Sequence, residues 1–316
     1  MTRIIDWMSG LKGRLIPLVP EERRLSGQAK LSLFIHWSFQ LGSTMSAVFL
    51  NLYLWRLTES LVVNALYNLI LYGLTSFVFV IAGRFVKRKG SMPVIRLGVT
   101  VSALFYLLVV LARENVVQYY AGFAAINAVA NALYWTGYLV VMYDVSTPQN
   151  RLRYTSLNTI YFTLAGLIGP ALAGFIISSF DALTGYVINF AFAFLMFAFT
   201  AVVSFRLKPA AAARIRVGKS RFYLRHMGLV IRKNRLYRGM LVGFALYGTF
   251  QGLLFFLPNI LLYQVLSRED MVGYLNILFS VMGIVAGLYI SRYGKDENLR
   301  NFLLASAAGF VLAASM

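Results

Sequence analysis

Polar side chains at helical spacing interrupt several long apolar stretches of this sequence. Gln40 and Thr44 lie one turn apart in the first stretch. A later stretch carries polar and aromatic side chains at steps of four, four and three, namely Asn127, Asn131, Trp135 and Tyr138. Another stretch carries Tyr247 and Gln251, which are four residues apart. Residues three or four positions apart share one face of a helix. Each set can therefore offer hydrogen bonds and rings either to a neighbouring helix or to a bound solute.

Charged side chains, the default functional candidates inside a membrane, are nearly absent from these stretches. Asp144 and Arg153 stand at the ends of apolar segments rather than near their middles. His36 lies within the first stretch and could relay protons. We prefer a hydrogen-bonded His at the membrane interface, because His36 lies only a few residues inside the predicted helix start.

The sequence lacks the residue clusters that catalysis or metal binding requires. It contains no Cys, and its 2 His residues are His36 and His226. A membrane enzyme would need carboxylate, His or Cys side chains gathered at one face. A channel would need a polar filter or a charged ring. We therefore expect no catalytic residue, no metal and no cofactor, and neither an enzyme nor a channel.

The composition indicates a bilayer as the solvent. The chain has 316 residues, of which 59% are hydrophobic and 13% are charged, and its net charge is +19. The mean hydropathy is +0.70. A soluble fold could not bury this much apolar surface, whereas a lipid interior accommodates it. We expect no nucleic-acid partner, because the basic residues fall between apolar runs instead of forming a face of a soluble fold.

The run lengths predict an all-α, polytopic transmembrane bundle. A span needs about 20 mostly apolar residues, and the two-residue alternation of a membrane barrel is not visible. The predicted helices cover residues 33–55, 62–83, 93–112, 117–143, 155–179, 184–205, 239–263 and 271–291, with a ninth from 301 to 316. The ninth is shorter than a span, so we expect the chain to be a truncated version of a longer protein.

Lys and Arg residues gather in alternate connections. All but three of the 30 lie on the side of the N-terminus, and the three exceptions are Arg56, Arg113 and Arg268. Cytoplasmic loops carry an excess of Lys and Arg. The distribution therefore predicts a multi-pass protein of the cell membrane with its N-terminus in the cytoplasm.

The predicted spans divide the chain into four parts. Residues 1–30 form a cytoplasmic segment with an interfacial helix near 3–15, and residues 31–206 form a six-helix bundle. Residues 207–238 form a basic linker, and residues 239–316 form part of a second bundle. The linker is either a basic helix on anionic headgroups or a plain loop that fixes topology.

A short pattern recurs at the same place in both bundles. After the second and eighth predicted helices the sequence reads Gly, four residues, Arg, one residue, Gly: Gly83, Arg88 and Gly90, then Gly287, Arg292 and Gly294. A first Gly lets a helix end pack closely, and a second permits positive φ in a tight turn. Matching features in two halves indicate an internal repeat of the kind found in transporters.

The turn resembles the signature of the major facilitator superfamily between its second and third helices, Gly-x-x-x-Asp-Arg-x-Gly-Arg-Arg. The match covers Gly83, Arg88 and Gly90, but Lys87 replaces the Asp, and Ser91 with Met92 replaces the basic pair. The fifth predicted helix is similar to the Gly-Pro-x-x-Gly-Gly motif of the antiporter branch, with Ala173 for one Gly. Its small residues are Gly166, Gly169, Pro170 and Gly174. They serve either helix packing, which we favour, or the direction of transport.

The resemblance implies a fold of two six-helix bundles, of which the second is only begun, and a secondary transporter that works by alternating access. It places helices one, four and seven around a central cavity, where the polar residues named first would suit a neutral or amphiphilic solute. It also implies that Asp144 pairs with Arg88, with Arg153 nearby, when a cytoplasmic gate is closed. The alternative is an ordinary interfacial Asp whose charge is offset by nearby Arg residues. We expect a lipid bilayer and a small-molecule substrate as partners, and a monomer when complete. A non-transporting membrane protein is the alternative.

Overall fold

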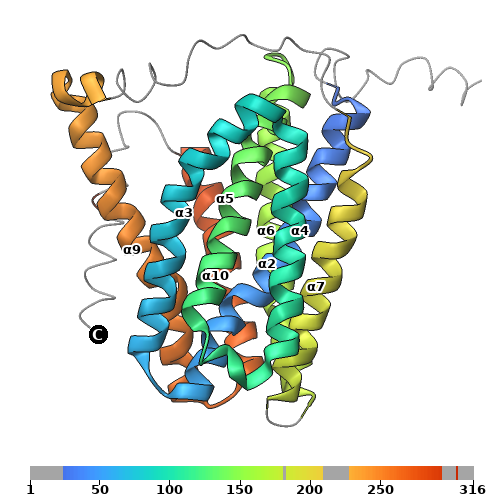
Figure 1. Ribbon diagram of the computed structural model, residues 1–316, viewed down its shortest axis with the longest axis vertical. Helices are drawn as coiled ribbons and strands as arrows, with labels where there is room; N and C mark the ends of the chain where they lie inside the picture. Colours follow the sequence, from blue (N-terminus) through green and yellow to red (C-terminus); the bar gives the residue numbers. More distant parts are fainter. Residues whose placement is uncertain (1–23, 181–182, 209–227, 294–303, 305–316) are drawn as a thin grey trace, which may run out of the picture.

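The computed structural model describes residues 24–180, 183–208, 228–293 and 304, and contains no strand within those ranges. Long helices run up and down in a bundle (Figure 1). They are α2 (Gly27–Thr58), α3 (Leu61–Lys89), α4 (Ser91–Ala112), α5 (Tyr120–Val145), α6 (Arg151–Ser178), α7 (Thr184–Ser204), α9 (Arg235–Leu266) and α10 (Glu269–Tyr293), with the short 3₁₀ helix η2 (Arg113–Val116) after α4. The predicted all-α bundle is confirmed.

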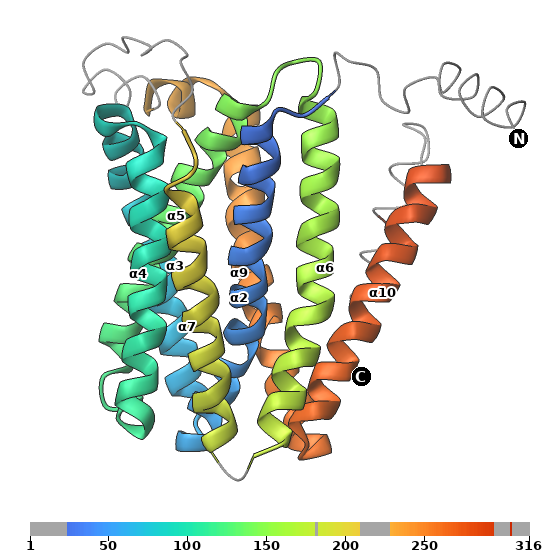
Figure 2. The same ribbon diagram turned by 90° about the vertical axis from the view of Figure 1, so that its right-hand side faces the viewer.

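The two ends of the bundle differ in charge. We call the end where α2 begins and α3 ends the basic end, and the end where α2 finishes and α10 begins the opposite end (Figure 2). The α3–α4 turn at the basic end carries Arg84, Lys87, Arg88 and Lys89. Which membrane face each end meets stays a prediction from these charges.

The helices extend past the predicted apolar limits. The Ser26 hydroxyl caps α2 by accepting a hydrogen bond from the Ala29 amide at 3.1 Å, so the helix begins at Gly27. Helix α3 continues through Gly83 to Lys89, where Gly90 ends it with φ at +89°. Hydropathy marks where a span leaves the apolar layer, whereas capping groups mark where the helix ends.

Five described helical segments are long and apolar enough to cross a membrane. They are Leu61–Lys89, Ser91–Val116, Tyr120–Val145, Arg153–Ser178 and Thr184–Ser204. Helices α2 and α9 have 32 residues each and α10 has 25, so all three have the length of a span. These three lie outside that set, and their crossing of the membrane stays a prediction.

Large apolar side chains cover much of the bundle's outer surface. Leu69, Phe77, Leu111 and Val202 are each at least 65% exposed. Patches of this kind on a soluble monomer would cause association. Lipid tails contact such side chains without penalty, which agrees with the membrane assignment.

The first six long helices pack around a shared core through small residues. A Cβ atom added to Gly137 of α5 would lie 2.6 Å from the Ile95 amide nitrogen of α4, and one added to Gly42 of α2 would lie 3.2 Å from Cβ of Met196 in α7. Close backbone approach of this kind drives helix association in lipid. The core thereby fixes α5 against α4 and α2 against α7, and α2 and α5 carry part of the candidate site.

Several predictions concern parts of the chain that are not described. The interfacial helix near 3–15, most of the linker (209–227) and nearly all of the ninth predicted helix lie outside the described residues. The proposed division into four parts therefore stays a prediction.

Candidate functional site

Three helices bring a set of polar and aromatic side chains together inside the bundle. We call this set the His36 cluster; it comprises Ser32, His36 and Gln40 of α2, Tyr134 and Tyr138 of α5, and Tyr154 and Asn158 of α6. Within each helix the members are four residues apart, so they share one face. The sequence singled out Gln40, Tyr138 and His36, and the structure brings them together.

His36 is held by hydrogen bonds on both ring nitrogens. Its Nδ1 lies 2.7 Å from the Tyr134 hydroxyl, and its Nε2 lies 3.5 Å from Gln40 Nε2. An amide nitrogen only donates, so His36 Nε2 accepts and Nδ1 carries the proton shared with Tyr134. The expected hydrogen bond is present. The ring is buried within the protein, at 1% exposed, and its place at the membrane interface stays a prediction.

Aromatic rings surround the imidazole. Tyr138 stacks on His36 with centroids 3.9 Å apart, and Trp135 meets it edge-on at 5.5 Å. The Tyr138 hydroxyl donates to Asn158 Oδ1 at 2.6 Å and lies 3.3 Å from the Tyr154 hydroxyl. These contacts hold Tyr138 in a single orientation while Trp135 stays partly exposed beside it. The cluster consists of ring faces and neutral hydrogen-bonding groups that are buried against one another, with Asn158 partly exposed, and it contains no carboxylate.

The other sequence candidates lie elsewhere. Asn127 donates to the Tyr67 hydroxyl of α3 at 3.0 Å, and Asn131 donates to Asn127 Oδ1 at 2.8 Å, which makes a separate pair. Thr44 donates to the Ala165 carbonyl at 2.8 Å and so joins α2 to α6. Tyr247 and Gln251 belong to α9, but their side chains lie outside the described residues.

The predicted gate residues occupy the basic end without forming the expected pair. Asp144 accepts a hydrogen bond from Ser91 at 3.3 Å, and no ion pair joins it to Arg88 within the described residues. A Cβ on Gly83 would meet nothing described within 4 Å, so the expected close approach is absent there. Arg153 lines a cavity beside α2.

The repeated motif in the second half can be followed only as backbone. Gly287 and Arg292 lie within α10, where their side chains are not described, and Gly294 lies outside the described residues. Their predicted gate role therefore stays a prediction.

The small residues of α6 join it to two helices. A Cβ on Gly169 would lie 3.0 Å from the Met45 amide nitrogen of α2, and one on Gly174 would lie 2.9 Å from the Glu269 carbonyl of α10. Reciprocally, a Cβ on Gly273 of α10 would lie 2.7 Å from the Pro170 carbonyl. Gly166 meets nothing described within 4 Å. These contacts favour the packing interpretation, and they join α6 of the predicted first bundle to α10 of the predicted second.

An ion pair at the opposite end was missed by sequence reasoning. Arg56 Nη1 of α2 lies 2.6 Å from Glu269 Oε1 of α10, and the Tyr186 hydroxyl of α7 donates to the same oxygen at 3.2 Å. The Arg56 guanidinium also lies 5.8 Å from the ring centre of Tyr263 in α9. We call Arg56, Tyr186, Tyr263 and Glu269 the clamp. The sequence offered one signal for this ion pair, because Arg56 and Glu269 carry opposite charges and lie at predicted helix ends on the same side of the membrane.

Comparison with known proteins identifies similar chains. The family model described as Major Facilitator Superfamily matches residues 33–316. An uncharacterized Bacillus subtilis (strain 168) protein, YqgE, is 29% identical over 266 residues, which cover 84% of this chain and 60% of that protein. An uncharacterized Geobacillus stearothermophilus protein, named for its place in the sodM 3' region, is 32% identical over 174 residues, covering 53% of this chain and 81% of its own length.

Proposed function

The chain belongs to the major facilitator superfamily of multi-pass membrane transporters, and from this we propose that it moves a small neutral or amphiphilic solute across the cell membrane by alternating access. Because this chain spans 60% of the length of YqgE, the activity is proposed for the complete gene product.

The contact between the two bundles is the observation that carries the proposal. The clamp and the Gly174–Gly273 crossing both join them at the opposite end. From there α10 diverges from α6 toward the basic end (Figure 2), and α9 diverges from α3 (Figure 1). Contact at one end with separation at the other is the arrangement that rocking of two half-bundles requires.

Trp135 and Asn158, the partly exposed side chains at the His36 cluster, form the proposed solute-binding wall of the first bundle, and the buried members of the cluster position them. Its groups are neutral donors, acceptors and ring faces, with Trp135 partly exposed beside Tyr138. Such surfaces hold neutral or amphiphilic solutes by hydrogen bonds and aromatic contact. Asn127 and Asn131 would extend that wall toward α3, and Tyr247 and Gln251 would line it from α9.

The basic end is the proposed cytoplasmic end, because cytoplasmic connections are enriched in Lys and Arg. The clamp then closes the outer face, and the described arrangement opens toward the cytoplasm. In this state the proposed Arg88–Asp144 contact at the inner gate is open, which agrees with the hydrogen bond from Ser91 to Asp144.

Uptake into proteoliposomes tests the proposal. The complete gene product would be reconstituted and supplied with radiolabelled panels of sugars, amino acids and amphiphilic drugs. We expect at least one solute to accumulate above protein-free liposomes, and Tyr138→Phe to reduce its uptake several-fold. Tyr119→Phe is the matched control, because Tyr119 is 59% exposed at the opposite end. No accumulation of any solute, with correctly folded protein, would support the non-transporting alternative.

A further inference from the structure

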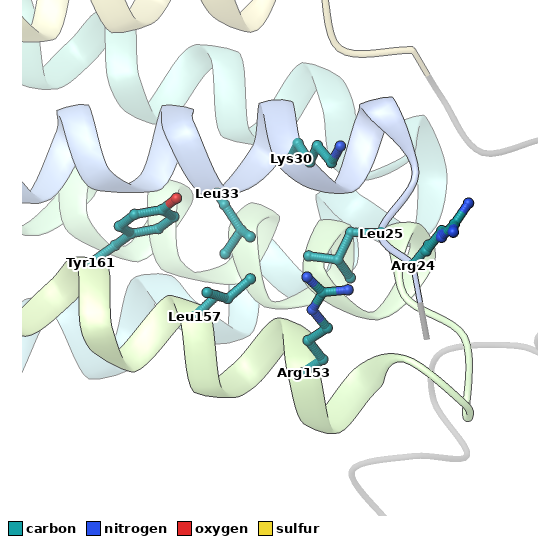
Figure 3. A pocket seen from close by; sticks show the side chains of 7 residues that line it. All are labelled: Arg24, Leu25, Lys30, Leu33, Arg153, Leu157 and Tyr161. Carbon is teal, nitrogen blue, oxygen red and sulfur yellow. The ribbon is translucent and has the colours of Figure 1, made fainter. Parts of the chain in front are cut away.

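A cavity of about 490 Å³ lies between the start of α2 and the first turns of α6 at the basic end (Figure 3). Its lining combines three cationic side chains with apolar ones: Arg24, Leu25, Lys30, Leu33, Arg153, Leu157 and Tyr161. None of these belongs to the His36 cluster or the clamp. The cavity is therefore a separate feature of the first bundle.

Helix geometry arranges the lining from charged to apolar. Arg153, Leu157 and Tyr161 follow at steps of four along one face of α6. In Figure 3 the Arg153 guanidinium points toward Leu25, whereas the charged ends of Arg24 and Lys30 point outward at the start of α2. Leu33 and Leu157 face each other farther along the two helices. The groove thus has a cationic mouth at the basic end and an apolar interior.

A hydrogen-bonded wall separates this groove from the bundle interior. Ser32 and Tyr154, whose oxygens lie 2.8 Å apart, join α2 to α6 next to Leu33 and Arg153 in the chain. Both are at most 1% exposed, whereas Ile160 and Phe162 on the outer surface of α6 are 53% and 47% exposed. The apolar outer surface beside the groove is what lipid tails contact.

We propose that this groove binds one anionic phospholipid, with its phosphate at Arg24, Lys30 and Arg153 and an acyl chain along the partly exposed Leu157 and Tyr161. Basic pockets between helices at the cytoplasmic side of a membrane recognise anionic headgroups. Arg offers a planar fork of donors that fits phosphate oxygens. A free anion would use the cationic mouth alone, whereas a lipid also fills the apolar interior. This lipid site depends on insertion of the protein in a membrane and on its predicted orientation, but it does not depend on the proposed transport activity.

Native mass spectrometry of the complete gene product with dioleoyl phosphatidylglycerol tests the site. We expect the protein to retain one phosphatidylglycerol after detergent exchange and little dioleoyl phosphatidylcholine. Neutralising the mouth with Arg24→Gln, Lys30→Gln and Arg153→Gln should lower retention at least tenfold. Arg153→Lys keeps the charge but loses the fork, so it should lower retention by a smaller factor.

The matched control removes the same charge from the same end. Arg84→Gln, Lys89→Gln and Arg206→Gln neutralise exposed cations outside the groove, and they should leave retention unchanged. A melting temperature in phosphatidylcholine that matches the unmodified protein shows that each variant is folded. If a variant fails this check, Leu157→Trp, which fills the apolar interior and leaves the mouth, should lower retention instead. Equal loss from both charge triples would overturn the proposal, because it would show general surface attraction.

Two further measurements separate the lipid from other sources of charge. Glycerol phosphate and inorganic phosphate should displace phosphatidylglycerol poorly, and efficient displacement by either would identify a site for a free anion. Glu21 and Glu22 precede Arg24 and lie outside the described residues. Glu21→Gln with Glu22→Gln should retain phosphatidylglycerol equally or better, and weaker retention would contradict the assigned headgroup charge.

Discussion

The two ends of the bundle are held together in different ways. At the opposite end, an ion pair and a crossing of small residues join α2 and α6 to α10, which belongs to the predicted second bundle. Arg56 and Glu269 of that ion pair lie 213 residues apart in the sequence. Toward the basic end, the His36 cluster joins α2, α5 and α6 of the first bundle only. Contacts between bundles can break and reform during a transport cycle, whereas contacts within one bundle must persist. Under the proposed alternating access, the opposite end is therefore the moving contact and the His36 cluster is part of a rigid body.

The largest expected effect comes from filling the Gly174–Gly273 crossing. Gly174→Val places side-chain atoms where the Glu269 carbonyl lies 2.9 Å from an added Cβ, so α6 and α10 must separate. Overpacking of this kind costs about 1–3 kcal/mol. Spin labels at Phe175 and Tyr274 should report a longer distance by pulsed electron resonance. Gly166→Val in the same motif should change it little, because that site is open in the described residues. An equal effect of both substitutions would contradict the assignment.

Breaking the clamp should have the next largest effect. Glu269→Gln removes the charge that Arg56 meets at 2.6 Å and weakens the acceptor of the Tyr186 hydroxyl. Because the Arg56 side chain is 30% exposed and the Glu269 side chain 12%, we expect a loss of about 1–2 kcal/mol from the closed state. The exchange Arg56→Glu with Glu269→Arg should restore part of the closure. A double-mutant cycle of Arg56 and Glu269 would measure their coupling through the Phe175–Tyr274 label distance. An absence of coupling would show that this ion pair does not hold the opposite end closed.

A substitution in the His36 cluster tests whether this cluster stabilises one bundle without affecting the contact at the opposite end. Tyr138→Phe leaves Asn158 Oδ1 without the hydroxyl now at 2.6 Å, which should lower the free energy of unfolding by about 1 kcal/mol. Thermal melting measures this loss. The Phe175–Tyr274 label distance should stay unchanged, because the cluster lies within one bundle. A shift in that distance would show that the cluster also controls the contact between bundles.

Acid should produce the smallest effect, confined to the opposite end. The hydrogen bond from Arg268, 2.5 Å from Asp270, lowers the pKa of that carboxyl below its ordinary value. A carboxyl whose pKa is lower in the folded state stabilises the fold above its unfolded pKa of about 3.9, and this stabilisation is lost as pH falls through the folded value. The melting temperature of the unmodified protein should fall slightly more below about pH 4 than that of Asp270→Asn. Identical acid profiles would exclude this contribution.

Hydropathy and charge predicted the helical bundle, but not its interior contacts. The run lengths located the described long helices because a span must match the lipid thickness. Helical spacing placed Gln40 on one face with Thr44 and Tyr138 on one face with Trp135, each pair on its own helix. It could not show that Asn127 turns toward Tyr67 instead, because the rotation of each helix is set by packing against others. Spacing along one helix also could not show that Tyr134 and Tyr138 of α5 cover the His36 ring.

The clamp escaped prediction for a related reason. Arg56 and Glu269 lie at helix ends, where charged residues are common, and nothing local distinguishes a pair that meets across two bundles. The small residues of α6 were recognised as a packing surface, but Gly174 acquires its partner only when α10 is placed beside it.

Paired distance measurements at the two ends test the central claim most directly. The chain has no Cys, so spin labels can be placed on introduced cysteines alone. One pair would be Phe175 with Tyr274 near the opposite end, and the other Thr159 with Val285 closer to the basic end. In bilayers we predict that Glu269→Gln lengthens the first distance and shortens the second, as rocking about a central site requires. Two distances that stay fixed, or that lengthen together, would contradict alternating access by these two bundles.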